Sequence, residues 1–124
     1  MGYRSDVEIL FYPQNPEDFA MLKLYVDENL PEEFEVGDIP PDHIWPQGNK
    51  YLHLRMEGTK WYPSFDEVTV FYTTFENWEN VFGSPPKCHY EFLRIGEDDT
   101  DIESSYSHGA QYALRSQRTI TLEF

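Results

Sequence analysis

Hydrophobic and polar side chains alternate near the N-terminus. Val7, Ile9 and Phe11 stand at every second position, with Asp6 and Glu8 on either side of the first of them. Successive side chains of a strand point to opposite faces, so the apolar residues share one face and the acids the other. This period of two predicts a β-strand with one buried face.

The next segment has the spacing of an amphipathic helix. Asn15 stands where an N-cap is favoured, and Pro16 occupies the first helical position. Apolar side chains then recur at intervals of three and four residues: Phe19, Leu22, Val26 and Leu30. Pro31 ends the predicted helix, because a proline restricts the residue before it to extended conformations.

A second strand and a second helix follow. Residues 51–58 alternate again, which predicts a strand. Ser64 and Glu67 have the spacing of a capping box, with Ser64 as the N-cap. Apolar and aromatic side chains then keep a helical period as far as Phe82. Because many of these residues are β-branched or aromatic, a strand over residues 68–74 stays open as the alternative.

Strands account for the rest of the pattern. Runs at 88–95 and 101–106 flank a turn at 96–100, and a last alternating run covers 112–124. The resulting order of elements is β-α-β-α-β-β-β. Such a mixture predicts a single α+β domain over residues 1–124, in which two helices pack on one mainly antiparallel sheet of about five strands.

The connection between the first helix and the second strand is long, acidic and rich in proline. It spans residues 31–48 and contains four prolines. Long irregular connections in compact domains are often functional or mobile. Its apolar side chains predict that parts of it fold back onto the core: Phe34, Val36, Ile39, Ile44 and Trp45.

The distribution of charge adds a candidate surface to this fold. The 124 residues carry 23 acidic and nine basic side chains, a net charge of −14. Nine acids and one lysine lie between Glu17 and Asp42, five acids and no base lie between Glu97 and Glu103, and the rest is nearly neutral. A net charge of ~2–8 in magnitude suffices for solubility. The two acidic segments are therefore either solvated loops or a surface for a basic partner.

The sequence lacks the motifs that carry most known chemistry. Its seven glycines form neither a phosphate-binding loop nor a dinucleotide fingerprint, and no nucleophile elbow occurs. The only cysteine, Cys88, is adjacent in a strand to His89 and so points away from it, which favours a buried structural thiol. The four histidines lack metal-ligand spacing, and the acids of 97–103 do not fit a calcium loop. We expect no enzymatic activity, no metal and no cofactor.

Composition also bears on location and on partners. A lone cysteine is typical of reducing compartments, and charged residues near the N-terminus do not fit an export signal. No run approaches the ~20 apolar residues of a membrane span. A charge of −14 disfavours direct contact with nucleic acid, because phosphates are bound by Lys and Arg. We expect an intracellular protein that contacts neither membranes nor nucleic acid directly.

The chain opens with Met-Gly-Tyr-Arg-Ser-Asp-Val, which leads directly into the first strand. Over residues 2–11 this opening resembles the start of small proteins of tailed bacteriophages, a group with no assigned activity. The resemblance carries over no functional residue. It implies the host cytoplasm as the location and a role as an accessory inhibitor of host nucleases, CRISPR complexes, restriction enzymes or polymerases.

Charge and resemblance agree on a class of function. We expect a non-enzymatic protein that binds a basic, nucleic-acid-binding surface of a host protein. Thirteen charges equal those of ~22 Å of duplex DNA, so DNA mimicry is one form of this hypothesis. The alternative is a virion or assembly component that oligomerises, for instance as a homodimer, through sheet edges and exposed aromatic residues. The predicted partner-binding residues are the acids of the long connection and of the 96–100 turn: Glu32, Glu33, Glu35, Asp38, Asp42, Glu97, Asp98, Asp99 and Asp101.

Overall fold

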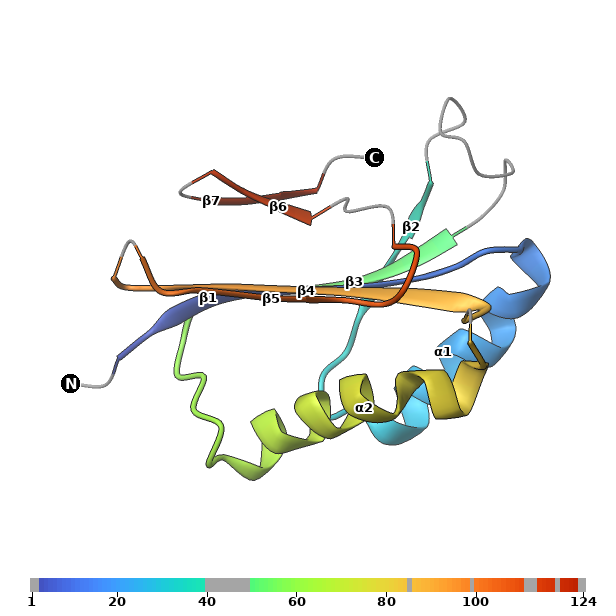
Figure 1. Cartoon of the computed structure of the whole chain (residues 1–124), viewed down its shortest axis with the longest axis horizontal. Coiled ribbons are helices and arrows are strands. Elements are labelled where there is room, and N and C mark those ends of the chain that lie inside the picture. Colours follow the sequence, from blue (N-terminus) through green and yellow to red (C-terminus); the bar gives the residue numbers. More distant parts are fainter. Residues whose placement is uncertain are drawn as a thin grey trace.

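Two helices cover one face of a five-stranded antiparallel sheet, and a short hairpin lies over the other face (Figure 1). The computed structural model describes residues 3–39, 50–84, 86–98, 100–110, 114–117 and 119–122, of which 115–117 and 119–122 are described for the backbone only. The elements are β1 (Ser5–Pro13), η1 (Pro16–Asp18), α1 (Phe19–Asn29), β2 (Glu35–Asp38), β3 (Lys50–Thr59), α2 (Asp66–Phe82), β4 (Cys88–Gly96), β5 (Ile102–Tyr106), β6 (Leu114–Gln117) and β7 (Thr119–Leu122).

The sheet has β1 at its centre, in the order β2-β3-β1-β4-β5. Ile9 on β1 lies opposite Leu54 on β3 and opposite Phe92 on β4. These three side chains are buried in the same core cluster, which lies between the sheet and the helices. The predicted α+β class and the first strand are therefore confirmed. The prediction that only one face of this strand is buried is wrong, because Glu8, Leu10 and Tyr12 on its other face are buried as well.

Aromatic side chains fill the core between the helices and the sheet. Trp78 of α2 is fully buried and stacks on Phe11 of β1, with 4.9 Å between ring centroids. Phe75 of the same helix stacks on Tyr90 of β4 at 4.8 Å. On α1, Leu22 and Val26 are buried, as the helical spacing predicts. The helical reading of residues 68–74 is confirmed, because all of them lie within α2.

The other face of the sheet has its own small core. Leu10, Tyr12 and Leu93 of the sheet are buried there with Ile39 and with Leu114 of β6. The hairpin of β6 and β7 covers this face as a separate two-stranded sheet (Figure 1). The sequence predicts one strand over 112–124. That prediction is wrong, because Gln117 pairs with Thr119 and the run folds back on itself.

The long connection is less irregular than the sequence predicts. It contains β2, whose Glu35 and Asp38 pair with His53 and Lys50 of β3. This edge strand has an exposed residue at three of its four positions, so no hydrophobic alternation announces it. Phe34 and Ile39 pack into the two cores, as predicted. The prediction is wrong for Val36, which is 48% exposed. Ile44 and Trp45 lie outside the described residues.

The predicted capping box is wrong as well. The N-cap of α2 is Phe65, and no side chain caps the helix. Ser64 lies instead in a turn that precedes the helix. The Phe65 amide closes this turn by donating to the Tyr62 carbonyl at 2.9 Å. Asn15 does precede the first helical segment, although its side chain makes no cap bond and the first turn is the 3-10 helix η1.

Candidate functional site: the acidic helix layer

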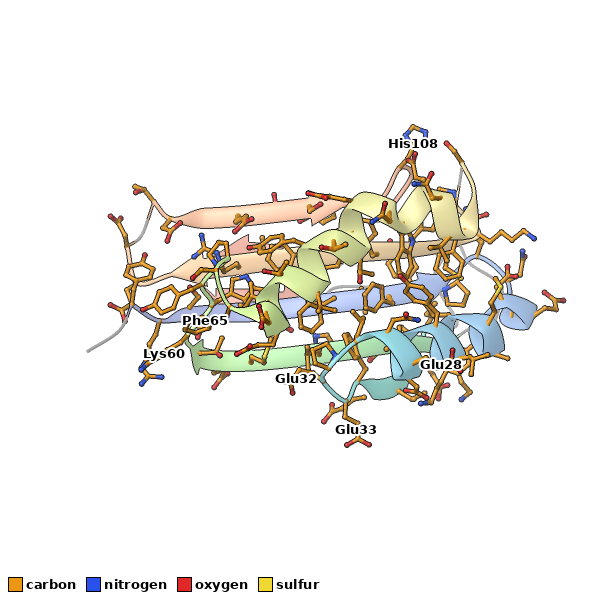
Figure 2. All side chains as sticks on the ribbon, turned by 90° about the horizontal axis from the view of Figure 1, so that it is seen from below. Glu28, Glu32, Glu33, Lys60, Phe65 and His108 are labelled. Carbon is orange, nitrogen blue, oxygen red and sulfur yellow. The ribbon has the colours of Figure 1, made fainter. Side chains whose placement is uncertain are left out.

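The acids of the connection are exposed but do not form one group. Glu32 and Glu33 follow α1, on the side of the molecule that carries the helices (Figure 2). Glu35 and Asp38 lie on the edge strand β2, and the carboxylate of Asp38 contacts Lys50 Nζ at 2.8 Å. Asp42 lies outside the described residues.

The acids of the β4–β5 turn are bound within the protein. Glu97 Oε1 accepts a hydrogen bond from the Arg4 amide at 2.9 Å. Asp98 Oδ1 accepts one from the Thr100 amide at 3.0 Å, which lowers the pKa of Asp98. Asp99 lies outside the described residues. These contacts hold the turn in shape, so its acids are less free to meet a partner than their sequence suggests.

Asp101 is held most firmly of these acids. Arg94 donates from Nη2 to Oδ1 at 2.7 Å and from Nη1 to Oδ2 at 3.1 Å. The Tyr3 hydroxyl donates to Oδ2 at 2.7 Å. Both partners stabilise the carboxylate, Arg94 more than Tyr3, and lower the pKa of Asp101 to about 2.

The acids of β2 and those of the β4–β5 turn lie at opposite edges of the sheet. Glu35 and Asp38 belong to β2, which is one edge strand, and the 96–100 turn leads into β5, which is the other. Four interstrand steps of ~4.8 Å separate these edges by ~19 Å. Glu35 and Asp38 therefore lie at one edge and the described acids of the turn at the other, while the six acids from Glu17 to Glu33 lie with α1 on the helix side of the sheet.

A larger acidic surface lies on the helix layer, which we define as residues 16–33 and 62–83. It carries ten acids and one lysine, Lys23, a net charge of −9. Lys23 itself is bonded to Asp27 at 2.9 Å. All of the acids are exposed except Asp18, which is half-buried. The ten are Glu17, Asp18, Asp27, Glu28, Glu32, Glu33, Asp66, Glu67, Glu76 and Glu79.

Packing beneath the surface brings the acids of the two helices together. Tyr25 of α1 lies edge-on to Trp78 and to Phe82 of α2, with 5.7 Å between centroids in each pair. A shallow groove of about 290 Å³ runs between the helices above this contact. The side-chain amides of Asn29 and Asn77 line this groove and bond within their own helices. Asn29 donates to the Tyr25 carbonyl, and Asn77 donates to the Thr73 carbonyl.

The acids of α2 are the part of this surface that sequence reasoning missed. Asp66, Glu67, Glu76 and Glu79 are all exposed, and α2 has no basic residue. In the sequence these four acids look scattered, because the uncharged residues 68–75 separate Asp66 and Glu67 from Glu76 and Glu79. The signal that could have found them is the absence of any lysine or arginine from Trp61 to Pro86.

Buried polar side chains on the opposite face are bound to one another. Glu91 is fully buried and accepts hydrogen bonds from the Tyr12 hydroxyl at 2.5 Å and from the Leu114 amide at 2.9 Å. Glu8 is 3% exposed and contacts His53 Nε2 at 2.6 Å. The Glu91 contacts attach the β6–β7 hairpin to the sheet, and the Glu8–His53 contact joins β1 to β3. Both groups of contacts therefore have a structural role.

Cys88 and His89 point to opposite faces of β4, as the sequence predicts. Cys88 is fully buried in the core beneath the helices, and burial raises the pKa of its thiol to about 12. His89 is 2% exposed and contacts Ser107 Oγ through Nδ1, at 3.0 Å. The thiol is therefore a packed core group, and its neighbour His89 points away from it.

A metal site and a membrane-spanning helix are both absent from the described residues. In the part of the chain that the structure describes, no group of three His, Cys, Asp or Glu side chains is placed to hold a metal ion. Neither described helix combines the length and hydrophobicity that crossing a membrane requires. Comparison with protein-family models, with characterised proteins and with solved structures found no match.

Proposed function

We propose that the protein is a non-enzymatic binding protein whose acidic helix layer engages a basic surface of another protein. The observation that carries this proposal is the ratio of ten acids to one lysine in the helix layer, where nine of the ten acids are exposed. A single-sign field of this kind accelerates encounter with a surface of opposite charge and repels partners of like charge.

The partner surface is of the kind that holds nucleic acid. Such surfaces carry clustered Lys and Arg, which neutralise phosphates. In the phage context that the N-terminal resemblance implies, the partner is a host protein, and binding blocks its nucleic-acid site in the host cytoplasm. The proposed contact surface is the helix layer and not the β4–β5 turn, because the described acids of the turn are bound within the protein.

Capture from a cell lysate tests the proposal. The bait is the wild type, a helix-layer variant with Glu28→Gln, Glu76→Gln and Glu79→Gln, or a control variant with Asp38→Asn, Glu97→Gln and Glu123→Gln. Both variants lose three negative charges, so net charge is matched. We expect the wild type and the control variant to retain basic nucleic-acid-binding proteins, and the helix-layer variant to lose them. High salt or added duplex DNA should release these proteins from the wild type. Equal retention by both variants contradicts the proposal.

For the alternative, assembly through sheet edges and exposed aromatic residues, the aromatic part has little support from the described residues. Among these, only Tyr3 and Phe65 are aromatic and substantially exposed, at 38% and 36%. Most of the other described aromatic rings pack in the two cores. Self-association that persists at high salt, measured by light scattering, would favour assembly over charge-led binding.

A further inference from the structure

The outer edge of β3 is only partly covered. β2 pairs with the first four residues of β3, from Lys50 to His53. β3 continues to Thr59, and no described strand lies beside residues 54–59 on the side away from β1 (Figure 2). An uncovered edge presents main-chain N–H and C=O groups that can pair with another strand.

Hydrogen bonds elsewhere in the sheet fix the direction of these groups. On β4, Tyr90 N–H donates to Ser107 Oγ, and the Tyr90 carbonyl accepts from the Ser107 amide, both at 3.0 Å. Main-chain groups of even-numbered β4 residues therefore point toward β5 and those of odd-numbered residues toward β1, since direction alternates along a strand. Their partners on β1 are even-numbered, as Leu10 is opposite Glu91.

The same alternation continues into β3. Odd-numbered residues of β1 point toward β3, where Ile9 is opposite Leu54. As far as the register shift between Met56 and Thr59, even-numbered β3 residues thus point inward and odd-numbered ones point outward. Beyond β2, the outward N–H and C=O groups are those of Arg55 and Glu57, and neither residue has a main-chain hydrogen bond to another described residue on that side.

A groove runs along this edge and is mainly acidic. It has a volume of about 640 Å³ and is lined by Glu33, Glu35, His53, Leu54, Arg55 and Glu57. Arg55 is neutralised by Glu57 at 2.6 Å, and His53 is bonded to Glu8. Glu33 and Glu35 are exposed and make no ion pair with another described residue.

We propose that this edge binds an extended basic segment of another protein, which adds to the sheet as a strand antiparallel to β3 and in line with β2. Main-chain bonds to Arg55 and Glu57 supply affinity, as in other cases of strand addition. The segment carries Lys or Arg at alternate positions, because Glu35 and Glu57 lie on the same face of the sheet. Glu35 is opposite His53, and Glu57 is four residues further along β3. This inference rests on the proposed function, since it specifies how one part of a basic partner binds.

A second copy of the chain is the less favourable occupant. Pairing of two β3 edges would bring together two molecules of net charge −14 and would place their Glu33 and Glu35 side chains near one shared edge. Like charges at such an interface oppose association. A basic segment is attracted to this edge, because its Lys or Arg side chains neutralise Glu33 and Glu35.

Amide hydrogen exchange with a defined probe tests the inference. The probe is a seven-residue peptide of alternating Lys and Val with blocked ends. Its control is the same peptide N-methylated at alternate residues, which keeps the charge and removes main-chain donors. We expect the probe, and not its control, to slow exchange of the Arg55 and Glu57 amides in the wild type by about tenfold or more. Protection that is absent at these two amides, or equal with both peptides, overturns the inference.

Matched substitutions at one position separate main-chain pairing from charge. Arg55→Pro removes an outward N–H that the sheet does not use, and Arg55→Gln removes the same charge while keeping the N–H. We expect Arg55→Pro to weaken probe binding by about tenfold relative to Arg55→Gln in fluorescence anisotropy. Equal binding by the two contradicts strand addition. If Arg55→Pro fails to fold by circular dichroism, the exchange measurement on the wild type still decides.

The two proposals fail separately. If capture of basic proteins depends on Glu28, Glu76 and Glu79 while the probe leaves the β3 edge unprotected, the helix-layer function stands and strand addition is wrong. If the probe protects the edge while the helix-layer variant captures as well as the wild type, the helix-layer function is wrong. Protection of both amides without peptide, together with a dimer in light scattering, assigns the edge to a second copy and overturns the inference.

Discussion

Arg94 donates to both carboxylate oxygens of Asp101, at 2.7 and 3.1 Å. Arg94 also donates from Nε to Glu103 at 3.0 Å, and from Nη1 to the hydroxyl of Ser5. One arginine thus joins the beginning of β1 to the β4–β5 hairpin. Asp101, which the sequence suggests as a partner-binding acid, is a structural member of this network.

Asp101→Asn is expected to lower the melting temperature. The pKa of Asp101 is held at about 2, below its ordinary 3.8, so this carboxylate stabilises the fold above about pH 4 and loses that effect as the pH falls toward 2. Thermal melts at neutral pH measure the loss, and melts below pH 4 should show the difference from wild type shrinking. Asp27→Asn is the control, because its exposed pair with Lys23 is worth ~0.5 kcal/mol or less. Equal melting of the two variants would assign the Arg94 contact no structural role.

His89 is expected to make the fold sensitive to mild acid. Gln14 donates from its amide nitrogen to the Pro86 carbonyl and lies 2.8 Å from His89 Nε2, so Nε2 accepts and the proton resides on Nδ1, toward Ser107. Burial, and then the charge of His108, lower the pKa of His89 from 6.5 to about 4. Between these values the unfolded chain binds more protons than the folded one. Stability should therefore decrease as the pH falls from about 6.5 to about 4, by on the order of 3 kcal/mol.

Urea midpoints across this pH range check the assignment. His89→Gln removes the titrating group and should flatten the pH dependence, at the cost of a lower midpoint at neutral pH because its ring contacts are lost. His108→Gln, at an exposed position, should keep most of the wild-type slope. A wild-type slope that survives in His89→Gln would assign the acid sensitivity to another group.

Cys88 is expected to resist thiol reagents in the folded protein. Burial raises the pKa of Cys88 from 9.0 to about 12, which reduces the thiolate fraction by about a thousandfold. Labelling with iodoacetamide should proceed only through opening of the fold and should accelerate sharply in urea. Rapid native labelling would show that the thiol is accessible and that the core beneath α1 is less tightly closed.

The sequence predicted the parts of the fold that a single period describes. Val7 and Ile9 predict β1, and Leu22 and Val26 predict α1, because the side chains that face the core between sheet and helices recur at a regular interval. β2 leaves no such trace, since it pairs through its main chain and exposes most of its side chains. The doubling back at residues 117–119 was also missed, because either arm alone continues the alternation.

The candidate site was predictable only in part, for a related reason. The exposure of Glu32, Glu33 and Glu35 followed from their position outside any hydrophobic pattern. The contact of Asp101 with Arg94 depends on the register of two strands, and the joining of α1 acids with α2 acids depends on Tyr25 packing on Trp78. Local patterns contain neither relationship, because both arise from tertiary packing.

Association rates measured against ionic strength test the helix layer most directly. A basic protein captured by the wild type is immobilised, and binding of the wild type, the helix-layer variant and the control variant is followed by surface plasmon resonance over a series of salt concentrations. The account predicts that the helix-layer variant associates more slowly at low salt and depends less on ionic strength, while the control, with the same net charge, behaves like the wild type. The same rate and salt dependence for both variants would mean that net charge alone drives binding, and would contradict the assignment of the partner surface to the two helices.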